Sequence, residues 1–424
     1  MRDTSGLRAV IICAGYDEAS HFKDPGLIAG ELQRLGYDVT CLVAQKGLAG
    51  VPYATWRVEL VPGSPGATTS WDSYSADVFL IYFIDSTQLQ LVNIIRKNNP
   101  HARIILKCDS DGLVPAGKVT ARSRAAKYQR DLAWFREIAS PYVMFQRPVW
   151  KAPLRIAAHL AWLAARVRPA DLRRIPKLRT YLESFDRIVI ESTEAAQNLV
   201  LNFPSVRDRT IVVPNGVLQR SSPPSYKTRR SVIAVGRFTD HRQKRPLVVW
   251  RVLCRFLERH PDWTADIIGP YDAELERIID RSRPSIRERA QLHGPCPNDE
   301  TRAIMANSSI YFSASAFEGF SVAMAEAVWE GCSVVSTPIP SAWDLVADGT
   351  SGTIAATFAE DDLLAALVSD AEKWSRNQYD RAKIATCWRS KLDWPELVRS
   401  ILGADEDEKT GPVKEPSNPS RLDS

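Results

Sequence analysis

The chain has 424 residues, 45% of them hydrophobic, so it can bury a large core, and its length favours two or more domains. Its formal net charge of +5 is too small to indicate a nucleic-acid-binding protein. Its seven cysteines are scattered with no C-x-x-C spacing, which argues against disulfides and metal ligands and predicts reduced thiols in a cytosolic protein.

The first predicted element is a β-strand in the run RAVIIC near the amino terminus. This run is too short for the apolar part of a secretory signal, and no stretch reaches the ~18 apolar residues of a membrane-spanning helix. We therefore expect neither a cleaved signal nor a transmembrane segment.

Short β-branched runs then alternate with helix-length segments, which is typical of parallel sheets in α/β proteins. Helices are predicted near 26–35, 87–98 and 193–201. The strands of this first group are RAVIICAG, YDVTCLVA, DVFLIYFI, RIILKCD, RIVIES and TIVVPNGV. Together they predict one Rossmann-like, doubly wound domain over residues 1–217.

The second half of the chain repeats this pattern. Residues 218–230 are polar and contain two consecutive prolines, which predicts an interdomain linker. A second Rossmann-like domain is predicted over 231–375, from the strands SVIAVGR, ADIIGP, AQLHG, SIYFSAS and CSVVSTP. We expect helices over 376–403 to cross back to the N-terminal domain. Residues 404–424 lack aromatic side chains and predict a disordered tail.

Residues 115–187 interrupt the first domain with a basic insertion. They contain sixteen Lys or Arg against five Asp or Glu, interleaved with Trp and Phe. Such a surface could bind an anionic membrane and bring the protein to a lipid-linked acceptor. It could instead form a helical subdomain that covers an acceptor cleft, because its Ala- and Arg-rich stretches favour helix. Nucleic-acid binding is the least favoured of the three interpretations.

The segment EGFSVAMAE is the most informative for function. It predicts a turn that leads into a helix carrying Glu318 and Glu326, eight residues and about 12 Å apart along the helix axis. Two such carboxylates could hold the sugar and the ribose of one extended ligand, with its diphosphate at the amides of Gly319, Phe320 and Ser321. Alternatively, both are ordinary helix carboxylates, Glu318 being favoured by the helix dipole.

The segment VGRFTDHRQKRP places Arg237 and Lys244 after a predicted strand. Two cations at the carboxyl edge of a sheet could neutralise a diphosphate, because ligands of open α/β folds bind at that edge. The alternative to phosphate binding is that these residues belong to a basic loop that is only solvated, since Arg242 and Arg245 are close in sequence.

Together these segments resemble the C-terminal half of family 4 glycosyltransferases, which carry a G-R loop, a following Lys and an E-x7-E motif. VPNGV at 213–217 and the later DLVADGTSGTI are also similar to that family, and the resemblance covers 187–356. It implies a GT-B fold, in which two Rossmann-like domains face a central cleft.

The resemblance also implies a role for each matching residue. Glu318 would contact the donor sugar, Glu326 the ribose, and Arg237 with Lys244 the diphosphate. It implies a retaining reaction without a metal or other cofactor, in which the leaving phosphate helps to deprotonate the acceptor. The six histidines show no metal-binding spacing.

The N-terminal half departs from the family pattern. The turn after the first strand, CAGYDEAS, has a single glycine, Gly15, which we assign to donor binding, and the later strand ends in KCDSDG where the family often has a His. Asp109 and Asp111 in that segment could orient the acceptor or contact the sugar as catalytic groups. Equally, D-S-D-G is a favourable turn sequence.

These features predict a retaining, hexosyltransferase-like enzyme that moves a sugar from a nucleotide-diphosphate sugar to a hydroxyl. The expected acceptor is a glycan or lipid-linked intermediate of a cell-surface polysaccharide or glycolipid. The expected location is the cytoplasm or the cytoplasmic membrane face, with no nucleic acid as partner. Two alternatives stay open: a sugar-nucleotide epimerase of the same fold, and a catalytically inactive sugar-nucleotide-binding or scaffold protein.

Overall fold

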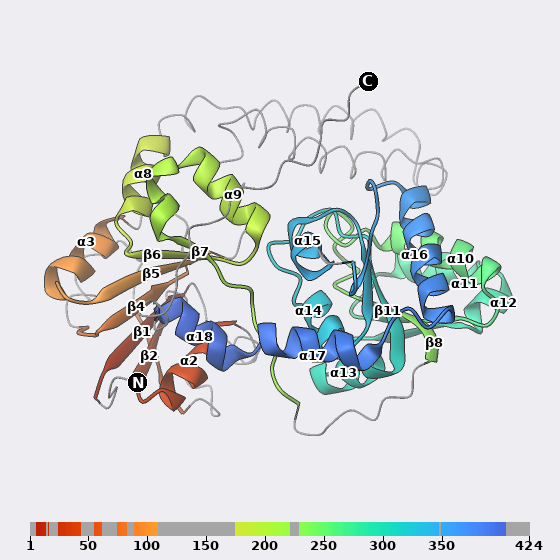
Figure 1. Ribbon diagram of the computed structural model, residues 1–424, viewed down its shortest axis with the longest axis horizontal. Helices are drawn as coiled ribbons and strands as arrows, with labels where there is room; N and C mark the ends of the chain where they lie inside the picture. Colours follow the sequence, from red (N-terminus) through yellow and green to blue (C-terminus); the bar gives the residue numbers. More distant parts are fainter. Residues whose placement is uncertain are drawn as a thin grey trace.

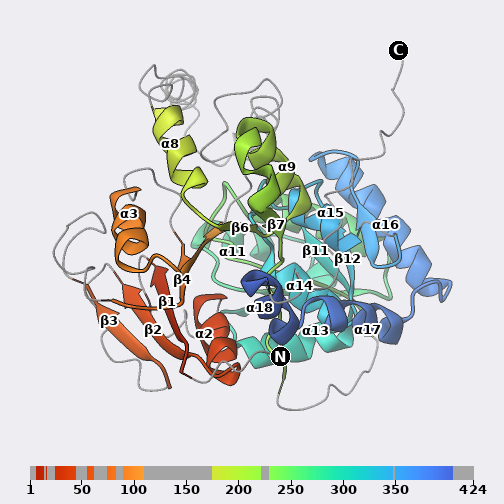
Figure 2. The same ribbon diagram turned by 60° about the vertical axis from the view of Figure 1, so that its left-hand side comes forward.

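The structure is a computed structural model that describes residues 6–13, 16, 24–43, 55–61, 74–82, 89–108, 174–220, 229–346 and 349–403. Several predictions fall outside the described residues. They are the assignments of Gly15, Asp109 and Asp111, most of the basic insertion, and the tail from 404. The described chain forms two α/β domains side by side, each built on a parallel sheet (Figures 1 and 2).

The N-terminal sheet has seven strands among the described residues, in the order β3-β2-β1-β4-β5-β6-β7, all parallel. Three strands begin with an exposed charged residue and are then buried, as expected for apolar runs covered on both faces. The strands are β1 Arg8–Cys13, β2 Asp38–Val43, β3 Arg57–Leu60, β4 Val78–Ile81, β5 Arg103–Cys108, β6 Arg187–Ile190 and β7 Thr210–Val212.

Helices cover both faces of this sheet. One core forms between the sheet and α2 (Asp24–Arg34) together with α18 (Trp394–Leu402). The other face packs against α3, α8 and α9, followed by the short 3-10 helix η3. Their bounds are α3 Leu89–Asn98, α8 Arg174–Glu183, α9 Thr193–Asn202 and η3 Pro204–Arg209. The helices predicted near 26–35, 87–98 and 193–201 are thus present.

The C-terminal sheet has six parallel strands in the described chain, in the order β10-β9-β8-β11-β12-β13. In each domain the sheet runs from the third strand through the second to the first, and the fourth strand lies on the other side of the first. The strand order therefore reverses between the first and fourth strands, which is the switch point of a doubly wound fold. The strands are β8 Arg229–Val235, β9 Thr264–Ile268, β10 Ala290–Gly294, β11 Ser308–Ser313, β12 Ser333–Ser336 and β13 Gly352–Ile354.

Helices again cover both faces. α10, α11, α12 and α16 pack on one side, and α13, α14, α15 and α17 on the other. The bounds are α10 Pro246–Arg259, α11 Ala273–Asp280, α12 Pro284–Arg287, α13 Asn298–Asn307, α14 Val322–Trp329, α15 Pro340–Val346, α16 Glu360–Ser375 and α17 Arg381–Lys391. Of the described helices, none combines the length and hydrophobicity needed to cross a bilayer.

The chain passes between the domains twice. The first passage follows β7, and the second lies between α17, which packs on α14, and α18, which packs on α2 (Figure 1). The two passages touch, because the N–H of Val217 donates to the carbonyl of Leu392 at 2.9 Å. A Cβ on Gly216 would lie 2.7 Å from the Trp394 ring, so glycine permits this close approach.

Candidate functional site

The switch point of the C-terminal sheet lies between β8 and β11. Their carboxyl ends lead into two loops, 236–245 before α10 and 314–321 before α14. Open α/β sheets bind ligands in the crevice outside the carboxyl ends of strands at such a point. Both loops contain residues that the sequence assigns to the donor, so topology brings the two motifs together.

The first loop begins with a close contact between two glycines. Gly269, directly after β9, has φ +128°, and a Cβ there would overlap the main-chain oxygen of Gly236. The N–H of Gly236 also donates to the carbonyl of Ile268 at 3.0 Å. This packing fixes the end of β8, from which Arg237 extends as an exposed residue.

The end of the same loop is tied to the second loop by Arg245, which is only 4% exposed. Its guanidinium donates to the carbonyl oxygens of Ala314 at 3.2 Å and Phe358 at 3.1 Å. Arg245 is therefore not part of a solvated basic loop. It joins the β8 and β11 ends of the site.

Lys244 and Glu318 meet at the centre of the site. The ammonium group of Lys244 forms an ion pair with Oε1 of Glu318, and Gln243 Nε2 donates to Oε2 at 2.8 Å. The Lys244 and Glu318 side chains are 16% and 8% exposed. In such a pair the cation is suited to an anionic group of a ligand, and the largely buried carboxylate is suited to its hydroxyl donors.

The structure corrects one expectation about the E-x7-E segment. α14 begins at Val322, so Glu318 lies in the turn before the helix and only Glu326 lies on it. The estimate of their separation, which assumes that both lie on one helix, therefore does not apply. The physical reason is that Glu318 bonds to Gln243 and Lys244 of the neighbouring loop, which hold it in the turn before the helix.

The other residues of that segment surround the start of α14. Ser321 is the N-cap residue of α14, and Gly319 is partly exposed. Phe320 is buried in the core that α13, α14, α15 and α17 form on their face of the sheet. Glu326 accepts a hydrogen bond from Asn298 Nδ2 at 2.7 Å. Burial raises the pKa of Glu326, although the Asn298 hydrogen bond acts in the opposite direction.

One group in the described chain has side chains that could hold a metal. The ligand atoms of His241, Asp272 and Glu274 lie within 4.8 Å of one another. His241 Nε2 lies 2.7 Å from Asp272 Oδ2, and Asp272 Oδ1 caps α11 by accepting from the N–H of Leu275 at 2.9 Å. These contacts link the β8–α10 loop to the start of α11.

The carboxyl edge of the N-terminal sheet carries a buried polar network that sequence reasoning missed. Lys107, with a side-chain exposure of 0%, lies 2.7 Å from Glu191 Oε1 and 3.2 Å from Asp24 Oδ2. It also donates to Asn215 Oδ1 at 3.0 Å, and the hydroxyl of Tyr82 donates to Asp24 at 3.0 Å. Burial alone lowers the pKa of Lys107, but the two carboxylates outweigh it and the pKa is raised. The sequence feature that could have indicated this network is the lysine inside the apolar strand RIILKC.

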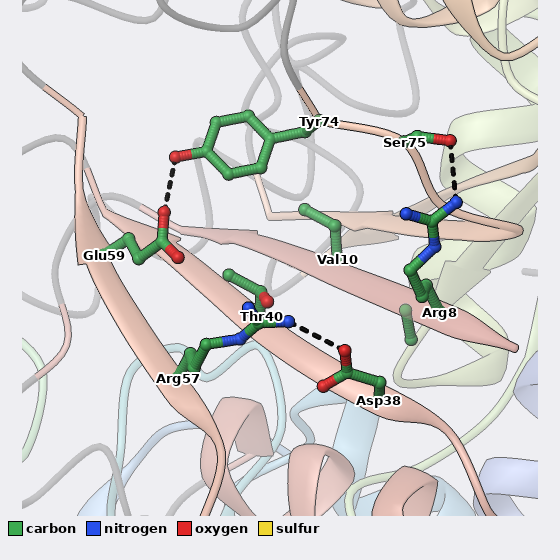
Figure 3. Close-up of a pocket in the computed structure, with 9 residues that line it drawn as sticks. Arg8, Val10, Asp38, Thr40, Arg57, Glu59, Tyr74 and Ser75 are labelled. Atoms are coloured by element: carbon green, nitrogen blue, oxygen red, sulfur yellow. Dashed lines mark hydrogen bonds and ion pairs between the residues drawn. The ribbon is translucent and has the colours of Figure 1, made fainter. Parts of the chain in front are cut away.

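A cavity of about 160 Å³ lies elsewhere, on the N-terminal sheet (Figure 3). Arg8, Asp38 and Arg57, the first residues of β1, β2 and β3, line it, which places it at the amino edge of the sheet. Two arginines face two carboxylates, and Tyr74 donates to Glu59 at 2.6 Å. Because its two positive and two negative side chains balance, and Arg57 pairs with Asp38 at 2.7 Å, the cavity has no evident preference for an anionic ligand.

The arrangement of both sheets is the GT-B fold. The lipopolysaccharide outer core galactosyltransferase WaaB has a TM-score of 0.62 at 15% identity, covering 94% of this chain and 99% of that one. HepE of Anabaena, in complex with UDP and glucose, has a TM-score of 0.59 at 13% identity, covering 95% and 100%.

A family model also matches most of the C-terminal domain. Residues 229–372 match the family model described as Glycosyl transferases group 1. The D-inositol 3-phosphate glycosyltransferase of Nocardia farcinica is 26% identical over 257 residues, 54% of this chain and 56% of that protein. The match thus spans about half the length of that relative. The resemblance noted in the sequence is confirmed for the fold and for the group 1 domain.

Proposed function

We propose that the protein is a glycosyltransferase that binds a nucleotide-diphosphate sugar between the loops 236–245 and 314–321. The observation that carries this proposal is the Lys244–Glu318 pair at the switch point of a group 1 domain. A cation and a carboxylate in contact match the two chemistries of such a donor, an anionic diphosphate and a ring of hydroxyl donors.

Each site residue has a role in this proposal. Arg237 and Lys244 bind the diphosphate, assisted by the amides of Gly319, Phe320 and Ser321 before α14. Glu318 accepts hydrogen bonds from the sugar hydroxyls, and Glu326 accepts them from the ribose. The positions support this division, because Glu318 faces Lys244 in the turn before α14, whereas Glu326 lies on α14 beside Asn298.

The proposed reaction replaces the bond from the anomeric carbon to the phosphate oxygen by a bond to the acceptor oxygen. The acceptor proton passes to the leaving phosphate, and the configuration is retained on the same face of the sugar. The two cations stabilise the charge that develops on the leaving group, so that no metal is required. This part rests on the family 4 resemblance and on the placement of Lys244.

We propose a glycan or lipid-linked hydroxyl as the acceptor. In support, one relative is named for D-inositol 3-phosphate, and a second, the gpi3 subunit of Schizosaccharomyces pombe, is a phosphatidylinositol N-acetylglucosaminyltransferase subunit. That subunit is 24% identical over 168 residues, 38% of this chain and 36% of the relative. The basic, aromatic composition of 115–187 supports contact with the cytoplasmic face of a membrane.

The test is a thermal-shift screen with UDP, GDP, ADP and their sugar derivatives, followed by incubation of the best donor, radiolabelled in the sugar. A ligand at 100 times its Kd stabilises the folded protein by about 2.7 kcal/mol. We expect one base to be preferred, and Lys244→Ala and Glu318→Ala to abolish sugar transfer.

Two results would replace this proposal. Epimerised sugar nucleotide formed without an acceptor would identify an epimerase. Binding without turnover, with unchanged cellular glycan synthesis in both variants, would identify an inactive sugar-nucleotide-binding protein.

A further inference from the structure

Two consecutive residues of the β8–α10 loop hold the Glu318 carboxylate from two sides. Lys244 pairs with Oε1, and the side-chain amide of Gln243 donates to Oε2 at 2.8 Å. The same Gln243 nitrogen donates to the carbonyl of Phe317 at 3.1 Å. Both hydrogens of the Gln243 amide therefore have an acceptor in the turn that carries Glu318.

Gln243 is itself fixed through its main chain. Its N–H donates to Asp240 Oδ1 at 2.9 Å, and its carbonyl accepts from the N–H of Ala316 at 2.8 Å. Main chain and side chain thus connect one loop to the turn of the other. A side chain held at both ends loses little further freedom on binding a ligand, so it is suited to position a neighbour.

Under the proposed function, on which this inference rests, two anionic groups compete for Lys244. In the structure its ammonium group is bonded to Glu318, whereas a bound donor presents it with a diphosphate of higher charge. When Lys244 turns to the diphosphate, Oε1 of Glu318 becomes available to a sugar hydroxyl. The carboxylate then needs another group to hold its orientation.

We propose that Gln243 is the positioning residue that keeps Glu318 directed at the donor sugar while Lys244 binds the diphosphate. Its amide is neutral, so it orients the carboxylate without cancelling the negative charge that makes Glu318 a strong acceptor. Gln243 thereby sets the preference of the site for a nucleotide sugar over the nucleoside diphosphate alone. A charged residue at this position would either neutralise Glu318 or repel it.

The experiment compares two ligands of the same base by isothermal titration calorimetry. These are the nucleoside diphosphate and its glucose ester, taken from UDP, GDP or ADP according to which stabilises the unaltered chain most. The variants are Gln243→Met, which keeps the length but removes both donors, and Lys244→Met. Gln291→Met, on the exposed face of the edge strand β10, is the matched control.

We expect Gln243→Met to bind the diphosphate as the unaltered chain does and the sugar ester about tenfold more weakly, as loss of a hydrogen bond to a charged group predicts. Lys244→Met weakens both ligands, and Gln291→Met neither. In Gln243→Glu, affinity for the sugar ester recovers as the pH falls, because the introduced carboxyl group becomes a donor when protonated.

Equal loss of both ligands in Gln243→Met, or no loss of either, would overturn the positioning role while leaving the proposed function intact. If the unaltered chain binds none of the six ligands, the proposed function fails first and this inference fails with it. Thermal unfolding of each variant without ligand separates a change in binding from a loss of folded protein.

Discussion

The carboxylate of Asp344 accepts a hydrogen bond of 2.8 Å from the main-chain N–H of Thr193, and the two residues belong to different domains. Thr193 is the first residue of α9, where helical N–H groups have no partner within the helix. Asp344 lies on α15, which contacts α9. A carboxylate of one domain therefore caps a helix of the other, and this contact links the two sides of the interdomain region.

Removing this interdomain cap should weaken the contact between the domains. We expect Asp344→Ala to speed hydrogen exchange at the Thr193 amide and to cost about 1 kcal/mol, the usual net contribution of one hydrogen bond, since Ser192 remains the N-cap residue. Asp344→Asn retains an acceptor oxygen and should stay close to the unaltered chain. Exchange measured by NMR or mass spectrometry checks this, and equal protection of Thr193 in all three proteins would contradict it.

The buried network at the N-terminal sheet should be sensitive to loss of its cation. Lys107→Met leaves Asp24 and Glu191 buried without their counter-charge, so we expect a loss of about 3–5 kcal/mol in the free energy of unfolding. Urea denaturation measures it. Lys97→Met, at an exposed position of α3, is the control and should change stability by less than about 0.5 kcal/mol. Similar values for the two variants would be inconsistent with a paired, buried Lys107.

The contact between Gly236 and Gly269 predicts that two glycine substitutions differ. Gly294 has φ +68° with open space around its Cβ position, so Gly294→Ala should cost about 1–2 kcal/mol from backbone strain alone. Gly269→Ala adds an overlap with Gly236 and should cost more than about 3 kcal/mol. Because Gly236 precedes Arg237, nucleotide affinity should fall as well in the second variant. Calorimetric unfolding and nucleotide titration test both effects.

The raised pKa of Glu326 predicts that folding stability and donor affinity change with pH in opposite directions. Burial favours its protonated form in the folded chain, so its contribution to stability is full below the ordinary pKa of 4.5 and is lost as the pH rises through the raised value. Binding of ribose hydroxyls favours the ionised form. Donor affinity should therefore fall as the pH is lowered through that same range.

Glu326→Gln tests both directions. The donor affinity of the Glu326→Gln variant should not depend on pH in this range. The stability of the unaltered chain should fall with rising pH when it is compared with the stability of the variant. Titration calorimetry and denaturation between pH 4.5 and 8 would measure the two quantities. An unaltered chain whose affinity is constant over that range would count against a role for Glu326 in the donor site.

Much of the fold was predictable because it depends on local pattern. The apolar runs that end in Cys108 and Val235 are β-strands, and alternation of such runs with helices specifies parallel, doubly wound sheets. The sequence also assigned Lys244 and Glu318 to one donor site, through the order of the motifs and the rule that ligands bind at the carboxyl edge, although it did not predict their ion pair.

The residues that hold this site in place were not predictable in the same way. Gln243 and Arg245 act through partners roughly 70 residues away along the chain, in contacts of 2.8 and 3.2 Å. Lys107 pairs with a carboxylate 84 positions away. Neither periodicity nor spacing encodes such contacts, because they depend on how loops from different strands pack. The start of α14 was misjudged for the same reason.

The return of α18 to the first domain bears on the order in which the protein can be assembled. Trp394, Leu397, Val398 and Ile401 complete the core on the α2 face of the N-terminal sheet. A ribosome delivers this helix only after the whole second domain has been synthesised. The second domain can thus complete its core while part of an apolar sheet face in the first is still exposed beside α2, so the domain that is synthesised first completes its core last.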